Sequence, residues 1–324
     1  MSAEVYVTDY GVSLATGDSA LDLMLACMAD LPLLVPDTNL PLGSASDESH
    51  YPVLLRYSDT VGLLPEKACL ILEEKALSSD LILLLLPGKT EPQYPQLKAG
   101  LQDVMNLSRI EIVYPHQLQK QFGLALKYLQ QGHINQLTVL GLDSMIGNAL
   151  MFDWMEQGKL RTQLNTDGRA VGEGLGWFTL GRQATEQHPV IRLHIGEWIS
   201  EATAPSHRSP EYHGLALSMQ PLLQHLGKEP GTWVYSRRQT PEDDLEAFMA
   251  FQYHWGHPKY RQLEQLSPAR QTGDLGTAAL PAAIALACER LVFRHYKKTS
   301  ALVSDSHPDG YHFSLLLSTD AMEA

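Results

Sequence analysis

The chain contains few cysteines. Its 324 residues include three, Cys27, Cys69 and Cys288, which lie far apart and in apolar stretches. This number and spacing exclude a disulfide framework and match no zinc-binding pattern. We therefore expect a protein of a reducing cytoplasm that carries no metal and no other cofactor.

Positive charge and long apolar runs are also scarce. Lys and Arg number 24 against 37 Asp and Glu, and the formal net charge of −13 disfavours binding to nucleic-acid phosphates. The longest apolar run, LILLLL at 81–86, is too short to span a bilayer. The first residues, MSAEVYVTDYG, lack the basic and apolar regions of a signal peptide. The sequence predicts neither a nucleic-acid partner nor contact with a membrane.

What the sequence does contain is an alternation of strand-like and helix-like segments, which predicts an α/β fold around a buried sheet. Residues 67–77 fit either type, and residues 32–60 are rich in Pro, Ser and Asp and form a long excursion. The strand-like segments are 4–12, 79–88, 108–115 and 137–144, and the helix-like segments are 19–31, 93–107 and 116–132.

The second half of the chain repeats this order. Segment 189–198 takes the place of the first strand, and 213–226 that of the first helix. The helix-like segment 272–291 corresponds to 116–132, and the strand-like segment 300–310 corresponds to 137–144. Two copies of one topology would build a pseudo-symmetric core. We expect the halves 1–184 and 185–324 to form one compact unit.

Five segments, in this order along the chain, resemble motifs of the β-ketoacyl synthase branch of the thiolase superfamily. FGLALKYLQQG resembles the helix behind the nucleophile, and DGRAVGEGLGWFTL resembles the DGFVxGEGAGxxVL loop. TPEDDLEA resembles the TPxNDxxEA that follows the first catalytic His. QTGDLGTAALPAAIAL resembles the TGHxxGAAG segment, and ALVSDSHPDGYHFSLLL resembles the terminal ALVNSFGFGGxNAxLxL. The region 32–107 matches poorly, and the chain is shorter than typical active members.

The resemblance implies a thiolase-like fold, in which two pseudo-repeated halves form five αβαβα layers. It also implies a structural use of the glycine-rich loops, since glycines let backbone segments pack closely. The residues that carry these loops are Asp167, Gly168, Gly172, Glu173, Gly174, Gly176, Gly273, Gly276 and Gly310.

Condensing enzymes of this family need a Cys thiolate, two His donors to the developing oxyanion and a supporting Lys. Counting back from Gly132 places the nucleophile at Pro115, with Tyr114 and His116 one residue away. The motifs place the two His positions at Ser236 and Asp274 and the Lys position at Ala269.

None of these residues supplies the required chemistry. Proline cannot attack a thioester, and the carboxylate of Asp274 would oppose an oxyanion. Each lost oxyanion donor costs about 3–4 kcal/mol of transition-state stabilisation by analogy with other acyl-transfer sites. The resemblance therefore implies a protein that keeps the fold and has no catalytic residues of the ketosynthase reaction.

Such a protein would act by binding other proteins, as a homodimer or as a heterodimer with another thiolase-like subunit. It resembles the degenerate proteins encoded beside effector genes of type VI secretion systems, which favours an adaptor. The alternatives are a silent subunit of a fatty-acid or polyketide ketosynthase and a binding protein for an acyl chain or acyl carrier. A further alternative is an acyltransferase with relocated residues, Asp274 with Ser236 or His116.

Three other polar groups have competing interpretations. His254 and His257 have a spacing that could ligate a metal, but a surface turn before Pro258 is favoured because no third ligand lies nearby. Arg237 and Arg238 either grip a phosphate or lie in a solvated turn. The segment HPDGYH at 307–312 is favoured as a modified loop over a new polar site.

Overall fold

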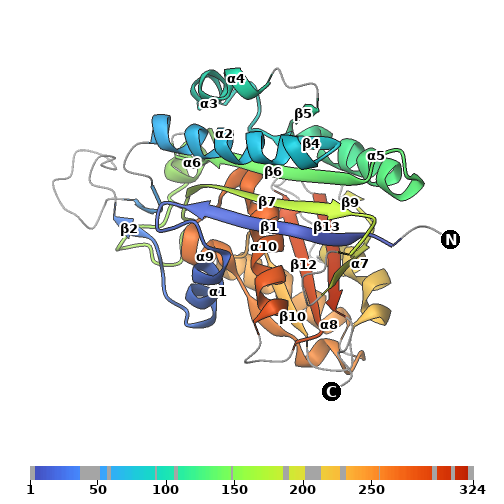
Figure 1. Ribbon diagram of the computed structural model, residues 1–324. Helices are drawn as coiled ribbons and strands as arrows, with labels where there is room; N and C mark the ends of the chain where they lie inside the picture. Colours follow the sequence, from blue (N-terminus) through green and yellow to red (C-terminus); the bar gives the residue numbers. More distant parts are fainter. Residues whose placement is uncertain are drawn as a thin grey trace.

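The computed structural model shows one mixed eleven-stranded sheet with helices against its faces (Figure 1). A separate pair of two-residue strands, β2 and β3, lies in the predicted excursion. The structure describes residues 4–36, 52–56, 60–91, 93–105, 109–146, 149–184, 190–200, 213–226, 231–254, 256–293, 298–307 and 311–319.

The N-terminal half alternates strands and helices as the sequence predicts. Its elements are β1 (Tyr6–Leu14), α1 (Ala20–Met28), β2 (Val35–Pro36), β3 (Val53–Leu54), α2 (Thr60–Ser78), β4 (Leu81–Leu85), α3 (Tyr94–Gly100), α4 (Gln102–Met105), β5 (Ile110–Val113), the 3-10 turn η2 (Pro115–Gln117), α5 (Leu118–Gln131), β6 (Gln136–Ser144), α6 (Ala149–Glu156) and β7 (Glu173–Gly181).

The C-terminal half follows with the same alternation. Its elements are β8 (Ile191–Ile195), β9 (Ile199–Ser200), α7 (His213–Met219), η4 (Gln220–His225), β10 (Thr232–Tyr235), α8 (Pro241–Tyr253), η5 (Tyr260–Gln262), β11 (Glu264–Leu266), α9 (Pro268–Thr272), η6 (Gly276–Ala278), α10 (Ala279–Val292), β12 (Ser300–His307) and β13 (Tyr311–Thr319).

The strand order confirms the predicted pseudo-repeat. The first half runs β1-β7-β6-β4-β5 and the second runs β8-β13-β12-β10-β11. In each half the first three strands pair antiparallel and the last three pair parallel. The half-sheets meet where β1 pairs with β8 through two residue pairs, Tyr6 with Arg192 and Val7 with Ile191. The boundary after residue 184 stays a prediction.

The burial of alternate strand residues defines five layers. In β4, Leu83 faces a core shared with α5 and α10, whereas Leu84 faces a second core under α2 and α3. In β10, Val234 faces the shared core and Trp233 faces a third core under α7 and α8. Since neighbouring side chains of a strand point to opposite faces, α5 and α10 lie between the two half-sheets. This arrangement is the expected αβαβα order.

Local signals explain most helix boundaries. Ser19 accepts a hydrogen bond from the backbone N–H of Asp22 at 3.2 Å and caps α1. Gly132 ends α5 in the left-handed conformation, with φ of 79°. The ambiguous segment 67–77 is part of α2, and the predicted helix 93–107 is two short helices that break at Leu101.

No helix in the described residues is long and apolar enough to cross a bilayer. The hydrophobic run at 81–86 includes all of β4, which is buried in the sheet. The run therefore belongs to the core, as its length predicts.

Candidate functional site

Segments from both halves meet at a cavity of about 50 Å³ beside Pro115. Pro115 follows β5 and begins η2, the turn that leads into α5. Proline fits there because the first position of a helical turn needs no N–H donor. The cavity is lined by Leu85, Val113, Tyr114, Pro115, His116, Leu118, Gln119, Trp198, Arg237, Thr277, Leu280, Asp305, Tyr311 and Phe313.

Arg237 is the charged centre of this region. Its guanidinium donates from Nε to Asp305 at 2.9 Å, from Nη1 to Asp274 at 2.7 Å and from Nη2 to the carbonyl of Gly276 at 2.6 Å. The side chains of Arg237, Asp274 and Asp305 are all buried. Burial alone would lower the pKa of Arg237, but the carboxylates of Asp274 and Asp305 raise it above its ordinary value. Arg237 is therefore a permanent buried cation.

The structure brings three of the four predicted catalytic positions to this cation or its cavity. Pro115 lines the cavity, Asp274 pairs with Arg237, and the Ser236 hydroxyl donates to Asp305. The fourth, Ala269, is buried in α9 and does not line the cavity. The roles assigned to these four residues stay predictions.

The glycine-rich loop packs backbone against backbone with the segment around Asp274. The N–H of Gly172 donates to the carbonyl of Asp274, and the N–H of Asp274 donates to that of Ala170, both at 2.9 Å. A Cβ on Gly172 would lie 2.1 Å from the carbonyl oxygen of Thr272. Gly273, in the segment that packs against Gly172, has a positive φ of 75°. These contacts support the predicted structural use of both loops.

The remaining loop residues differ in their surroundings. Cβ atoms on Gly168, Gly174 and Gly176 would also meet neighbouring atoms closer than 3.0 Å. Glu173 is buried and accepts a hydrogen bond from Ser144 at 2.9 Å, whereas Asp167 is exposed. Gly310 lies outside the described residues.

None of the three cysteines lies at this cavity. Cys27 is buried in α1, where burial and the nearby Asp30 raise the pKa of its thiol to about 12. Cys288 is buried in α10, and burial raises its pKa well above the ordinary value. Cys69, on α2, contacts the carbonyl of Gly100 at 3.4 Å. The two buried thiols stay protonated near neutral pH and are poor nucleophiles.

Asp143 is a buried acid behind the same region. One oxygen accepts from the N–H of Thr277 at 2.9 Å, and the other accepts from the Gln93 amide at 3.3 Å. Burial raises the pKa of Asp143 to about 7, an effect that the charge of Asp274 increases and the two hydrogen bonds oppose. The sequence analysis missed this residue because nothing in GLDS marks the Asp as buried.

Asp143 should make stability depend on pH. Because its folded pKa lies above its unfolded value, it favours the fold below about pH 4, and this contribution is lost as pH rises to about 7. Asn can keep the bond to Thr277 without charge. The free energy of unfolding of Asp143→Asn relative to wild type should therefore increase by about 1–3 kcal/mol as the pH rises from about 4 to about 7. Urea unfolding of both proteins at acid and at slightly alkaline pH measures this. An equal difference at both pH values would contradict it.

The relocated catalytic set is not assembled. Ser236 bonds to Asp305 and not to Asp274, and the Asp274 carboxylate is paired with Arg237. His116 is exposed, and its ring stacks on Tyr114 with centroids 6.2 Å apart. Within the described residues, no imidazole is hydrogen-bonded to Ser236.

Three sequence interpretations are corrected. Arg237 does not lie in a solvated turn, because it is buried and three of its five N–H donors meet Asp305, Asp274 and the carbonyl of Gly276. His254 is a buried histidine whose Nε2 donates to the carbonyl of Ala216 at 2.9 Å, so it belongs to neither a metal site nor a surface turn.

The segment 307–312 also contributes more than a modified loop. His312 is buried, and its Nδ1 lies 2.9 Å from the Ser306 hydroxyl and 3.3 Å from Glu246. The Tyr235 hydroxyl donates to the same carboxylate at 2.5 Å. These contacts tie the ends of β10, β12 and β13 to α8. Residues 308–310 between them lie outside the described residues.

The arrangement of the sheet, the helices and the glycine loops around Arg237 is that of a β-ketoacyl synthase-like, thiolase-like fold. The chain is similar to the ketosynthase from module 6 of the bacillaene synthase of Bacillus subtilis 168, at 12% identity and a TM-score of 0.72 over 99% of this chain and 73% of that one. It is similar to the ishigamide ketosynthase/chain length factor, at 13% identity and a TM-score of 0.73 over 99% and 100%.

A third similar structure, AntDE:AntF, is a type II PKS acyl-carrier protein in complex with its ketosynthase bound to the hexaketide. It matches at 12% identity and a TM-score of 0.73 over 98% of this chain and 100% of that one. No family model and no curated protein matches the sequence. Identities this low show a shared fold.

Proposed function

We propose that this chain is a non-catalytic subunit of ketosynthase-like fold that works by binding another protein. The observation that carries the proposal is the centre of the fold. At the positions that the sequence motifs predict for the thiolate and the two oxyanion donors, the chain has Pro115, Ser236 and Asp274, and Asp274 is paired with the buried Arg237. Three of the five N–H donors of Arg237 are held by Asp305, Asp274 and the carbonyl of Gly276, and the two carboxylates offset its charge.

The cavity argues against an acyl-binding role. Its volume is about 50 Å³, whereas an engineered apolar cavity that binds benzene has about 150 Å³. The space is large enough for water and too small for a long acyl chain. We therefore favour protein binding, in the cytoplasm, over storage or sensing of an acyl chain.

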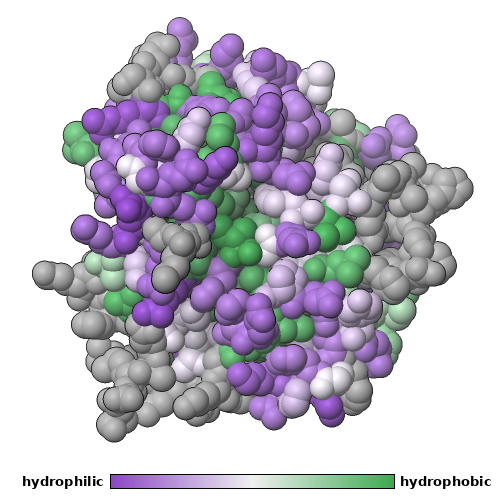
Figure 2. Space-filling model, turned by 90° about the vertical axis from the view of Figure 1, so that its right-hand side faces the viewer, coloured by the Kyte–Doolittle hydropathy of each residue, from purple (hydrophilic) through white to green (hydrophobic). Residues whose placement is uncertain are grey.

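The end of the sheet at β5 offers a surface for a partner. Within the described part of the chain, β5 pairs with β4 alone and so leaves one edge unpaired. Its Ile110 and Ile112 are half-buried and pack against the core under α2 and α3, and between them Glu111 is the one charged residue of a strand that contains no Lys or Pro. Figure 2 shows that hydrophobic residues also reach the surface elsewhere, in the middle of the face on the right in Figure 1.

A lysine on this edge should block a partner strand. Ile112→Lys is expected to weaken self-association, or capture of the partner, by at least about tenfold, because a charge would be buried in the new pairing. The matched control is Gln265→Lys, on the strand β11 at the other end of the sheet. Light scattering after gel filtration measures the dimer, and circular dichroism checks the fold. Equal effects of the two substitutions would refute the assignment to β5.

The partner itself decides between the two forms of the proposal. Capture of partners from native lysate, with Ile112→Lys as the negative control and mass spectrometry as the readout, identifies it. An effector or another secretion protein would select the adaptor role related to type VI secretion. An active ketosynthase or an acyl carrier would select the silent-subunit role, which the likeness to a ketosynthase/chain length factor also favours.

A further inference from the structure

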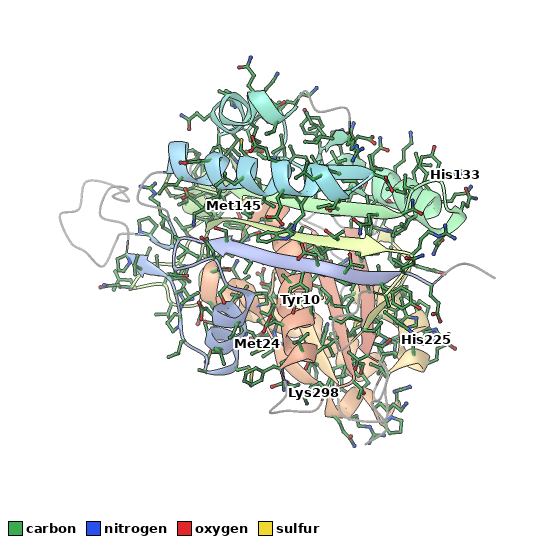
Figure 3. The ribbon with its side chains drawn as sticks, in the orientation of Figure 1. Tyr10, Met24, His133, Met145, His225 and Lys298 are labelled. Atoms are coloured by element: carbon green, nitrogen blue, oxygen red, sulfur yellow. The ribbon has the colours of Figure 1, made fainter. Side chains whose placement is uncertain are left out.

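A second cleft has a volume of about 400 Å³. It is formed by β8, η4, the residues that precede β1, and the last turn of α5, and it shares no lining residue with the cavity beside Pro115. His225, at the end of η4, lies at the right-hand edge of Figure 3, on the side that Figure 2 turns toward the viewer.

Two stacked imidazoles form one wall of this cleft. The rings of His194, from β8, and His225 have centroids 4.7 Å apart and planes 12° from parallel. Nε2 of His194 lies 3.0 Å from the Ser318 hydroxyl, and the Gln224 amide lies 3.3 Å from Nε2 of His225. The stack is stable while at least one ring is neutral, since two imidazolium ions would repel each other.

The other groups around the stack are mostly N–H donors. Arg192 lies two residues before His194 on β8 and lines the cleft with it, and α5 contributes the Gln130 amide. The carboxylate that faces the cleft is Glu4, 3.8 Å from Arg192, and it also accepts from the Tyr6 hydroxyl at 2.5 Å. Arg192 and the two protonated rings together would carry three positive charges against this single acid.

The positive groups around His194 disfavour its protonation. Burial lowers the pKa of His194, and the positive charges of His225 and Arg192 lower it further, while Glu4 opposes them. An anion close to both rings would raise this pKa, because it would offset the repulsion that hinders the second protonation. Anion binding and proton binding would then assist each other.

We propose that the cleft between His194, His225 and Arg192 is a proton-linked binding site for an oxyanion of the phosphate type. A tetrahedral oxyanion presents several acceptor oxygens, which suit imidazolium, guanidinium and amide N–H donors that converge from separate elements. Affinity rises as pH falls through the range in which histidine titrates. The site is independent of the proposed partner binding at β5.

Inorganic phosphate tests the proposal directly. The titration of His194 is followed by NMR with and without millimolar phosphate, at an ionic strength held constant with sodium chloride. Phosphate should raise the pKa of His194 by about half a unit or more. Sulfate, which keeps its double negative charge between these pH values, should bind at least about tenfold more tightly at about pH 5.5 than at about pH 7.5, as measured by calorimetry. Glycerol 3-phosphate in place of phosphate distinguishes a phosphomonoester from the free ion.

Variants separate this cleft from general surface charge. His225→Asn and Arg192→Gln should each abolish the phosphate-induced shift at His194. The control is His133→Asn, an exposed histidine near the same edge of Figure 3 but outside the cleft, and it should leave the shift unchanged. An unchanged His194 titration in phosphate would overturn the proposal, as would equal losses of the shift in the His133 and His225 variants.

Discussion

Arg237→Met is expected to lower the free energy of unfolding by about 3–5 kcal/mol. Methionine has a similar length but no charge, so Asp274 and Asp305 would stay buried without the cation that now pairs with both. The carbonyl of Gly276 would also lose a donor at 2.6 Å. Urea unfolding followed by circular dichroism measures the loss.

The neighbouring arginine provides the control. Arg238 pairs with Asp244, but Asp244 also binds Arg270 at 2.5 Å and is partly exposed, so Arg238→Met should cost about 1 kcal/mol or less. Adding Asp274→Asn and Asp305→Asn to Arg237→Met should restore more than half of the lost stability, because it removes the uncompensated charges. If the triple variant were less stable than Arg237→Met, packing and not charge would explain the effect.

Gly172→Ala should destabilise the fold by about 3 kcal/mol, at the upper end of the cost of overpacking. The new Cβ would lie 2.1 Å from the carbonyl oxygen of Thr272, and backbone can give way only by shifting the two loops. Because Gly172 also donates to the carbonyl of Asp274, such a shift would disturb the partner of Arg237. The loss is measured by urea unfolding.

A glycine with open space calibrates this prediction. Gly123, in α5, has no neighbouring atom within 4 Å of the place that a Cβ would take, so Gly123→Ala should stabilise the protein by about 0.5–1 kcal/mol through helix propensity. If Gly172→Ala were as well tolerated as Gly123→Ala, the claim that the close packing of the two loops requires a glycine at position 172 would be wrong.

Backbone constraints leave local signals, from which the sequence predicted the α/β alternation and the repeated halves, whereas the five-layered thiolase-like fold followed from the resemblance to β-ketoacyl synthases. The glycines at 172 and 273 mark a close approach of two loops, and Gly132 marks the end of a helix. The alternation of apolar residues marks strands, and its recurrence after residue 189 predicts the second half. These signals depend on neighbours in sequence.

The electrostatics of the site could not be predicted in the same way. Arg237 and Arg238 are adjacent and look alike in sequence, but one is buried between two carboxylates and the other pairs with a partly exposed one. The difference comes from Asp274 and Asp305, which only tertiary structure brings to Arg237. His254 was misjudged for the same reason, since its partner is the carbonyl of Ala216 on another helix.

The most direct test of a non-catalytic centre is a turnover assay with acyl and malonyl thioesters of coenzyme A and of an acyl carrier. We expect no condensation, no decarboxylation and no acyl adduct in the intact mass of the protein. An acyl adduct on Cys27, Cys69 or Cys288, or a turnover that Asp274→Ala abolishes, would contradict the proposed function.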